Sequence, residues 1–216
     1  EEERHVHKVA TPDVGGIAMF IGFLVAFLVA RSMDTFAELF RSGDSEPRGV
    51  LIAPTLMFLV GFVDDIYEIS APAKVVGTVV VAVVLVLYGV TMFYFRVPFN
   101  EVYILSDEWV PFVTVLWLLG MTNAINLIDG LDGLAAGIVA IAAFAFFLYS
   151  QRLADPSIGM LTQPNVGPLV AILAVGICVG FLPHNFNPAR IFMGDGGALL
   201  LGLLMAVSTS VVGGRA

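Results

Sequence analysis

The stretch VVGTVVVAVVLVLYGVTMFYF (residues 75–95) carries no charged side chain. It is long enough to cross a lipid bilayer, whose hydrocarbon core takes about 20 residues of α-helix. Six further apolar runs lie at 14–30, 50–63, 109–121, 134–149, 166–182 and 198–212. These runs are continuous, whereas the strands of outer-membrane barrels alternate apolar and polar residues over about ten positions. We therefore expect an all-α, polytopic membrane protein with about seven transmembrane helices.

Some of the runs are shorter than a straight crossing requires, most clearly residues 50–63. Such a run either borrows flanking polar residues or forms a re-entrant segment; we expect all seven to span. No soluble domain, long linker or repeat interrupts them, so residues 1–216 are predicted to form a single integral membrane domain. Because the chain starts at Glu1 and stops at Ala216, just after an apolar run, we also expect it to be an excerpt of a longer protein.

The composition excludes several classes of protein. Hydrophobic residues make up 58% of the 216 residues and charged residues 13%, with a mean hydropathy of +0.93. A soluble domain of this size cannot bury so much apolar surface. The net charge of −8 argues against nucleic acid as a partner, because phosphate binding needs clustered Lys and Arg. The single cysteine, Cys178, lies in an apolar run and is expected to serve packing.

If all seven runs span, the polar loops fall alternately on two sides of the membrane. One side receives residues 1–13, 64–74, 122–133 and 183–197. These loops contain every dense group of Asp, Asn, Gly and His, so we expect one polar site on one face of the membrane. Cytoplasmic loops usually carry more Lys and Arg than loops on the other side. Here the count of these residues weakly favours the opposite side as the cytoplasmic one, and it does not decide the orientation.

Asp64 and Asp65 directly follow an apolar run. Adjacent carboxylates at a membrane boundary repel each other and are costly to desolvate. A bound divalent cation would remove that cost. The alternative is a solvated helix end; we favour the cation.

Asn123, Asn126, Asp129 and Asp132 recur at every third position. On a helix this spacing would form a slowly drifting stripe of oxygen ligands. Carboxylate and amide oxygens suit Mg²⁺, which commonly binds few carboxylates together with substrate phosphate. The alternative is an ordinary Asn/Asp/Gly turn between helices, and the regular spacing favours the site.

Asp195 lies in MGDGG, directly before the last apolar run. A glycine-rich turn that opens a helix presents backbone N–H groups to phosphate, and Asp195 could bind a metal on that phosphate; it could also simply cap the helix. Lys8 could neutralise a diphosphate or lie at the membrane interface. His184 and Arg190, which flank Asn187, could hold phosphate or a nucleotide.

Together these residues describe Mg²⁺-assisted phosphoryl transfer that involves a lipid phosphate. A secondary transporter or channel is the main rival, with a non-catalytic membrane scaffold as a second. Transporters place ionisable groups near the bilayer midplane, whereas no Asp, Glu, Lys or Arg lies in the middle of any of the seven runs. The acids at the run ends favour an enzyme at the interface.

The same segments, in the same order, resemble the polyprenyl-phosphate N-acetylhexosamine-1-phosphate transferase family. The specific motifs are NLIDGLDGLAAG (126–137) and NPARIFMGDGG (187–197), with support from GFVDD (61–65) and residues 8–16. The resemblance implies a fold of ten or eleven helices, of which this chain lacks the first and the last few. It also implies an active site on the cytoplasmic face of the bacterial inner membrane. There a polyprenyl phosphate attacks a UDP-amino sugar and UMP leaves, with Mg²⁺ or Mn²⁺ as cofactor. The resemblance also implies a homodimer.

Two positions distinguish branches of this family. Glu68 and Ile128 stand where the phospho-N-acetylmuramoyl-pentapeptide transferase branch typically has Lys and Thr. These differences favour the N-acetylglucosamine-1-phosphate branch, which serves teichoic acid, arabinogalactan or O-antigen synthesis. The pentapeptide branch is the alternative. Residues 181–190 also look similar to actinobacterial members.

The resemblance also implies roles for individual residues. Asp195 and one of Asp64 and Asp65 would hold Mg²⁺, and the other of that pair would deprotonate the lipid phosphate. Both direct attack and an aspartyl intermediate remain open. The residues expected to bind substrate are Lys8, Asn123, Asn126, Asp129, Asp132, His184, Asn187 and Arg190.

Overall fold

The computed structural model describes residues 11–41, 43–96, 102–155 and 165–213. The elements follow in the order α1 (Gly15–Ser32), η1 (Asp34–Phe36), α2 (Ala37–Arg41), α3 (Glu46–Tyr67), α4 (Ala71–Leu87), β1 (Tyr94–Arg96), β2 (Val102–Ile104), α5 (Val110–Ile128), α6 (Leu134–Leu153), α7 (Gly167–Asn185) and α8 (Gly194–Gly213). The two strands form a small antiparallel hairpin. The all-α class is confirmed, and the hairpin is a minor addition to it.

The helix starts follow from proline. In four helices the second residue is proline, whose fixed φ suits the first turn and whose missing N–H would be unpaired there in any case. These residues are Pro47, Pro72, Pro111 and Pro168. Several helices begin before, or end after, the apolar run that predicted them. The run 50–63 lies within α3, so this short run does borrow its flanking polar residues, Asp64 and Asp65 among them.

The predicted span at residues 75–95 is wrong at its C-terminal end. The helix α4 ends at Leu87, and Gly89 follows with φ +87°. Glycine adopts this left-handed conformation at little cost and commonly closes helices. The N–H of Gly89 donates to Val86 and that of Val90 to Leu85, which completes the end of the helix. The chain then enters β1.

Seven of the helices correspond to the seven apolar runs. Six of them, among the described residues, are long and apolar enough to cross a membrane: α1, α3, α5, α6, α7 and α8. The seventh, α4, has 17 residues, the lower end of the range of about 17–25 for a transmembrane helix. Cys178 is fully buried in α7, as its predicted packing role requires.

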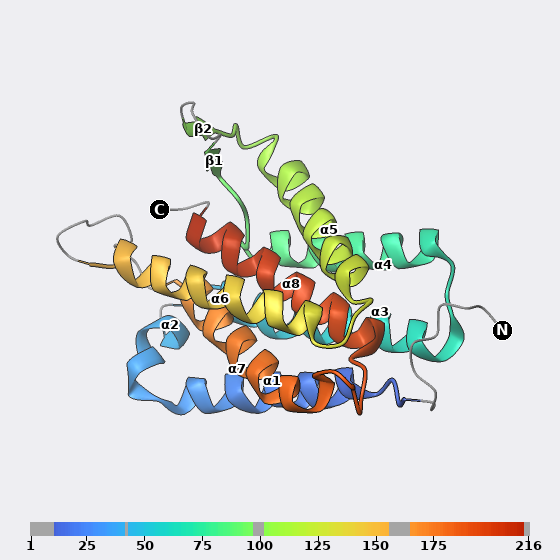
Figure 1. Cartoon of the computed structure of the whole chain (residues 1–216). Coiled ribbons are helices and arrows are strands. Elements are labelled where there is room, and N and C mark those ends of the chain that lie inside the picture. Colours follow the sequence, from blue (N-terminus) through green and yellow to red (C-terminus); the bar gives the residue numbers. More distant parts are fainter. Residues whose placement is uncertain (1–10, 42, 97–101, 156–164, 214–216) are drawn as a thin grey trace.

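Helix α8 is the centre of the bundle, and the other long helices surround it (Figure 1). Of its apolar span, 94% is buried, against 22–44% for the other five candidate spans. A helix that is apolar on every side is suited to such a position. Large side chains such as Ile21, Val25 and Leu28 of α1 remain exposed, as expected for surfaces that face lipid.

The first turn of α8 lies against α3 at very short range. A Cβ on Gly61 would come within 2.5 Å of the backbone oxygen of Asp195, so only glycine permits this approach. The start of α8 lies at the right of Figure 1, with the ends of α3 and α5. The hairpin lies at the opposite end of the bundle. The polar segments are thus gathered around the start of the central helix.

Candidate active site

Asp65 holds the first turn of α8. Its Oδ1 accepts a hydrogen bond from the backbone N–H of Asp195 at 2.6 Å, and its Oδ2 accepts one from that of Gly196 at 3.0 Å. The first N–H groups of a helix have no partner within the helix, and a carboxylate there also interacts favourably with the helix dipole. The amides that the sequence assigned to phosphate therefore donate to Asp65, which fixes the position of Asp195.

Lys74 joins two carboxylates from different helices. Its Nζ pairs with Oδ2 of Asp64 on α3 and with Oδ2 of Asp195 on α8. The Nδ2 of Asn126 donates to the other oxygen of Asp195 at 2.6 Å. Asp64 is buried, and the Lys74 side chain is 20% exposed. Two distant acidic motifs thus converge on one positive charge.

Two further carboxylates border this cluster. A Cβ on Gly194 would lie 2.8 Å from an oxygen of Asp13 and also from one of Asp65, so both acids flank the first residue of α8. Burial and the nearby charge of Asp195 raise the pKa of Asp13. Burial, followed by the charges of Asp13, Asp195 and Asp65, raises the pKa of Asp129 to about 7. Such shifts are frequent at functional sites.

Asp129 and Asp132 do not continue the helical stripe. Helix α5 ends at Ile128, so Asp129 is its cap and Asp132 lies in the turn that leads to α6. Oδ2 of Asp132 accepts hydrogen bonds from Nδ2 of Asn187 at 3.0 Å and from the N–H of Ala189 at 2.9 Å. Asp132 therefore contacts the α7–α8 loop.

The remaining predicted residues lie in different surroundings. Nδ2 of Asn123 donates to the Leu119 carbonyl of its own helix at 2.8 Å. His184 and Arg190 are exposed, and the Arg190 N–H donates to the His184 carbonyl at 2.9 Å. Lys8 lies outside the described residues.

The N-terminal motif nevertheless reaches the site. The N–H of Phe192 donates to the Pro12 carbonyl, and the N–H of Gly15 donates to the Phe192 carbonyl, both at 2.9 Å. These bonds join the start of α1 to the loop that precedes α8. Three of the four polar segments expected on one face of the membrane, together with the described end of the fourth (residues 11–13), are therefore brought together.

Lys74 and Asp13 were not predicted as site residues from the sequence. Lys74 stands nine positions after Asp65 at the start of α4, and Asp13 lies within a segment already noted for Lys8. The only signal was their place in loops on the side of the other acids.

Only some of the carboxylates in this cluster are suited to bind a divalent cation. In the described ranges, no group of three or more His, Cys, Asp or Glu side chains is arranged to hold a metal ion. Asp64 and Asp195, however, already share the charge of Lys74, and oxygen donors of this kind suit Mg²⁺. Both oxygens of Asp65 are engaged with backbone amides.

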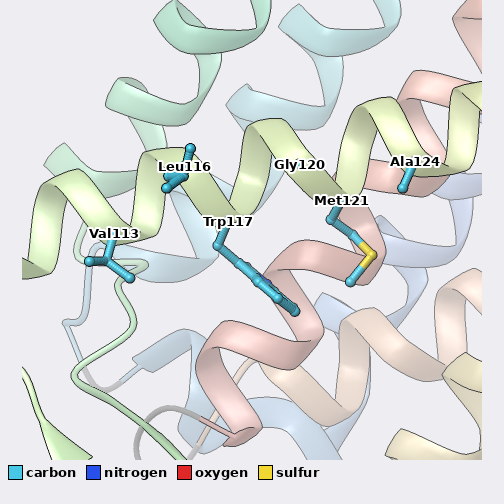
Figure 2. Close-up of a pocket in the computed structure, with 6 residues that line it drawn as sticks. All are labelled: Val113, Leu116, Trp117, Gly120, Met121 and Ala124. Atoms are coloured by element: carbon cyan, nitrogen blue, oxygen red, sulfur yellow. The ribbon is translucent and has the colours of Figure 1, made fainter.

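An open apolar pocket of about 330 Å³ runs along α5, which leads to Asn126. It is lined by Val113, Leu116, Trp117, Gly120, Met121 and Ala124. Figure 2 shows Val113, Trp117 and Met121 on one side of the helix. Trp117 donates from Nε1 to Thr209 Oγ1 of α8 at 2.9 Å, which fixes one wall of the pocket.

The fold and the site define a multi-pass membrane protein with an acidic site at one end of its helix bundle. Residues 48–213 match the family described as glycosyl transferase family 4, and the chain belongs to this family. The resemblance drawn from its motifs is thereby confirmed.

Three relatives illustrate the similarity. The decaprenyl-phosphate N-acetylglucosaminephosphotransferase of Mycobacterium leprae is 36% identical over 215 residues, which cover 98% of this chain and 53% of the relative. A probable undecaprenyl-phosphate N-acetylglucosaminyl 1-phosphate transferase of Bacillus subtilis is 35% identical over 94% of this chain and 52% of its own length. A phospho-N-acetylmuramoyl-pentapeptide-transferase of Desulfitobacterium hafniense is 33% identical, over 93% and 62%. The chain thus spans about half the length of the first two relatives.

Proposed function

We propose that the protein to which this chain belongs transfers N-acetylglucosamine 1-phosphate from UDP-N-acetylglucosamine to a polyprenyl phosphate. An oxygen of the lipid phosphate would attack the β-phosphorus, the bond between the two phosphates of the donor would break, and UMP would leave. The observation that carries this proposal is the convergence of Asp64 and Asp195 on the ammonium group of Lys74, at one end of the membrane helix bundle. The names of the mycobacterial and Bacillus relatives support the choice of donor.

Asp64 and Asp195 are the residues that would hold Mg²⁺, or Mn²⁺ in its place. A bound Mg²⁺ would neutralise charge on the donor diphosphate. Asp65 would keep Asp195 in position through its bonds to the α8 amides. Asn126 would orient the same carboxylate through its side-chain amide. The partly buried acids together would draw cations to the site.

The two substrates would approach from different directions. The apolar pocket on α5 would take part of the polyprenyl chain, because it is lined by apolar side chains and lies on the helix that ends beside Asp195. Exposed Arg190 and His184, with Lys8, would contact the phosphates or the nucleotide. The family resemblance supports a site on the cytoplasmic face of the inner membrane, and a homodimer.

The test is UMP release by the full reading frame that encodes this chain, purified in detergent with polyprenyl phosphate and Mg²⁺. UDP-N-acetylglucosamine and UDP-N-acetylmuramoyl-pentapeptide are supplied in parallel. We expect release with the first donor alone. Release only with the pentapeptide donor would show that Glu68 and Ile128 do not mark the branch. Silence with both donors from a folded protein would contradict the proposal and favour another UDP-sugar or a transporter.

A further inference from the structure

We propose that Thr209, on the central helix α8, is a positioning residue for the lipid substrate. It holds the indole ring of Trp117 as a wall of the apolar pocket on α5, beside the part of the isoprenoid chain that lies far from the phosphate. The inference rests on the proposed function, which supplies the polyprenyl phosphate as the occupant of the pocket. It adds a residue that acts through its neighbour, and a dependence on the length of the lipid chain.

The hydrogen bond between the two side chains has a fixed direction. The Trp117 Nε1 donates to the Thr209 Oγ1 at 2.9 Å. The Thr209 hydroxyl donates its own proton within α8, to the carbonyls of Met205 at 3.0 Å and Ala206 at 2.9 Å. Because a hydroxyl has one proton to donate, its oxygen presents a lone pair to the indole. Helix α8 therefore holds the acceptor in place.

The indole ring is held at its polar edge and is open to the pocket elsewhere. Thr209 is 7% exposed, whereas Trp117 is 36% exposed. Of the six residues that line the pocket, only Trp117 carries a side-chain nitrogen or oxygen, and Figure 2 shows its ring extending from α5 towards the neighbouring helix. The bond to Thr209 thus turns this polar atom towards α8 and leaves an apolar wall for the lipid. Without its acceptor, the indole N–H would have to turn to another partner, because an unpaired donor is costly in apolar surroundings.

The pocket and the acidic site lie along one contact between α5 and α8. At the site end, the Asn126 side chain donates to Asp195. Further along, a Cβ on Gly202 would lie 2.6 Å from the Cα of Thr122, so the two helices touch closely there. Trp117 lies nine residues before Asn126 on α5, about 14 Å along the helix axis. A lipid whose phosphate lies beside Asp195 therefore reaches the indole only with a chain of several isoprene units.

The experiment compares Thr209→Val and Thr209→Ser in the full reading frame in detergent, with Kd measured by titration calorimetry. Valine keeps the shape of threonine and removes the acceptor, whereas serine retains it. The lipids are decaprenyl phosphate and geranyl phosphate, whose extended chain is shorter than the distance from Asn126 to Trp117. For Thr209→Val we expect Kd and KM for decaprenyl phosphate to rise about fivefold. We expect kcat, KM for the sugar nucleotide and Kd for geranyl phosphate to stay within about twofold of the unsubstituted values. Thr209→Ser should behave as the unsubstituted protein.

Two further positions test whether Thr209 acts through the indole. Ser210→Ala removes a buried hydroxyl that donates to Ala206 of the same helix at 2.8 Å, and it should leave Kd for decaprenyl phosphate unchanged. Trp117→Phe keeps an aromatic ring without the N–H, so it should raise Kd for decaprenyl phosphate and not for geranyl phosphate. Adding Thr209→Val to Trp117→Phe should cause no further rise, since both changes remove the same bond. Trp117→Phe also decides the question if Thr209→Val alone does not fold.

Equal losses for the two lipids would overturn the proposal, because a merely structural role does not distinguish the length of the chain. An unchanged Kd for decaprenyl phosphate in Thr209→Val, or a Thr209→Ser variant as impaired as Thr209→Val, would overturn it as well. An unsubstituted protein that binds decaprenyl phosphate without releasing UMP would refute the proposed function, and the comparison of Kd values would still test Thr209. An unsubstituted protein that does not bind this lipid would overturn both.

Discussion

Lys74 holds two carboxylates that reach it from different helices. In a Lys74→Met variant the two acids would face each other without a counter-charge, since removal of one member of a partly buried ionic group leaves the others unpaired. We expect a loss of about 3 kcal/mol, measured as a lower Tm in detergent without divalent cations. The Lys74→Arg variant keeps the charge and should retain most of the stability.

Divalent cations supply the complementary measurement on Lys74→Met. Mn²⁺ should raise its Tm more than that of the unsubstituted protein, because no ammonium competes for Asp64 and Asp195. Equal increases in the two proteins would contradict the assignment of this pair to the cation.

Asp129 should make stability depend on pH. Its pKa is raised from 3.8 to about 7 in the folded protein, first by burial and then by nearby acids. The stabilising contribution is therefore full below about pH 4 and is lost as the pH rises through about 7. We expect Asp129→Asn, which cannot ionise, to be more stable than the unsubstituted protein near pH 8 and to lose this advantage towards pH 5. The measurement is Tm against pH in detergent.

A matched control for this profile is Asp34→Asn. Asp34 is exposed in the short helix η1, which joins α1 to α2. Figure 1 shows α2 at the end of the bundle away from the start of α8. Its substitution should leave the profile unchanged. An Asp129→Asn profile that also follows the unsubstituted protein would refute the account of this residue.

The acids of the site could be predicted individually, but their partners could not. Charge at the end of an apolar run is costly, so Asp64, Asp65 and Asp195 stand out in the sequence. The Lys74–Asp195 pair joins positions 121 residues apart, and no local pattern connects them. Asp132 was expected to contact substrate because its spacing matches that of Asn126, whereas its contact with Ala189 depends on where two loops meet.

At the scale of the element, α5 supplies both a polar end and an apolar pocket. Gly120 lines the pocket, and a Cβ there would meet nothing within 4 Å. Gly120→Leu should therefore fold, since leucine also favours the helix, and should fill the pocket. We expect KM for polyprenyl phosphate to rise about tenfold, with KM for the sugar nucleotide unchanged.

The control for the pocket is Gly22→Leu on α1, where a Cβ likewise meets nothing within 4 Å. This variant should leave both KM values unchanged. If Gly120→Leu also leaves KM for the lipid unchanged, the polyprenyl chain does not use this face of α5.

The positions of the helices could be predicted well from the sequence, whereas the residues at which they end could not. The apolar runs marked all seven long helices because each must bury or expose apolar surface over a bilayer-length segment. The end of α4 depended on the conformation of Gly89, and an apolar window does not distinguish a helix from the strand that follows. Helices α3 and α5 extend into the polar motifs, so their last turns carry the site residues.

At the scale of the whole molecule, the central position of α8 was not predictable from the sequence. Its hydropathy is similar to that of the five surrounding candidate spans. In a membrane, lipid-facing and buried helix surfaces are both apolar, so the usual contrast between inside and outside is lost. The shared location of the polar loops could be predicted, because it follows from counting helices.

We propose that the acidic cluster at the start of α8 performs phosphoryl transfer. The most direct test is the rate of UMP release by an Asp195→Asn variant of the full reading frame, with Tm measured in parallel. We expect kcat to fall at least about a hundredfold, while the protein stays folded with a similar Tm. A folded Asp195→Asn variant that releases UMP at the unsubstituted rate would contradict it.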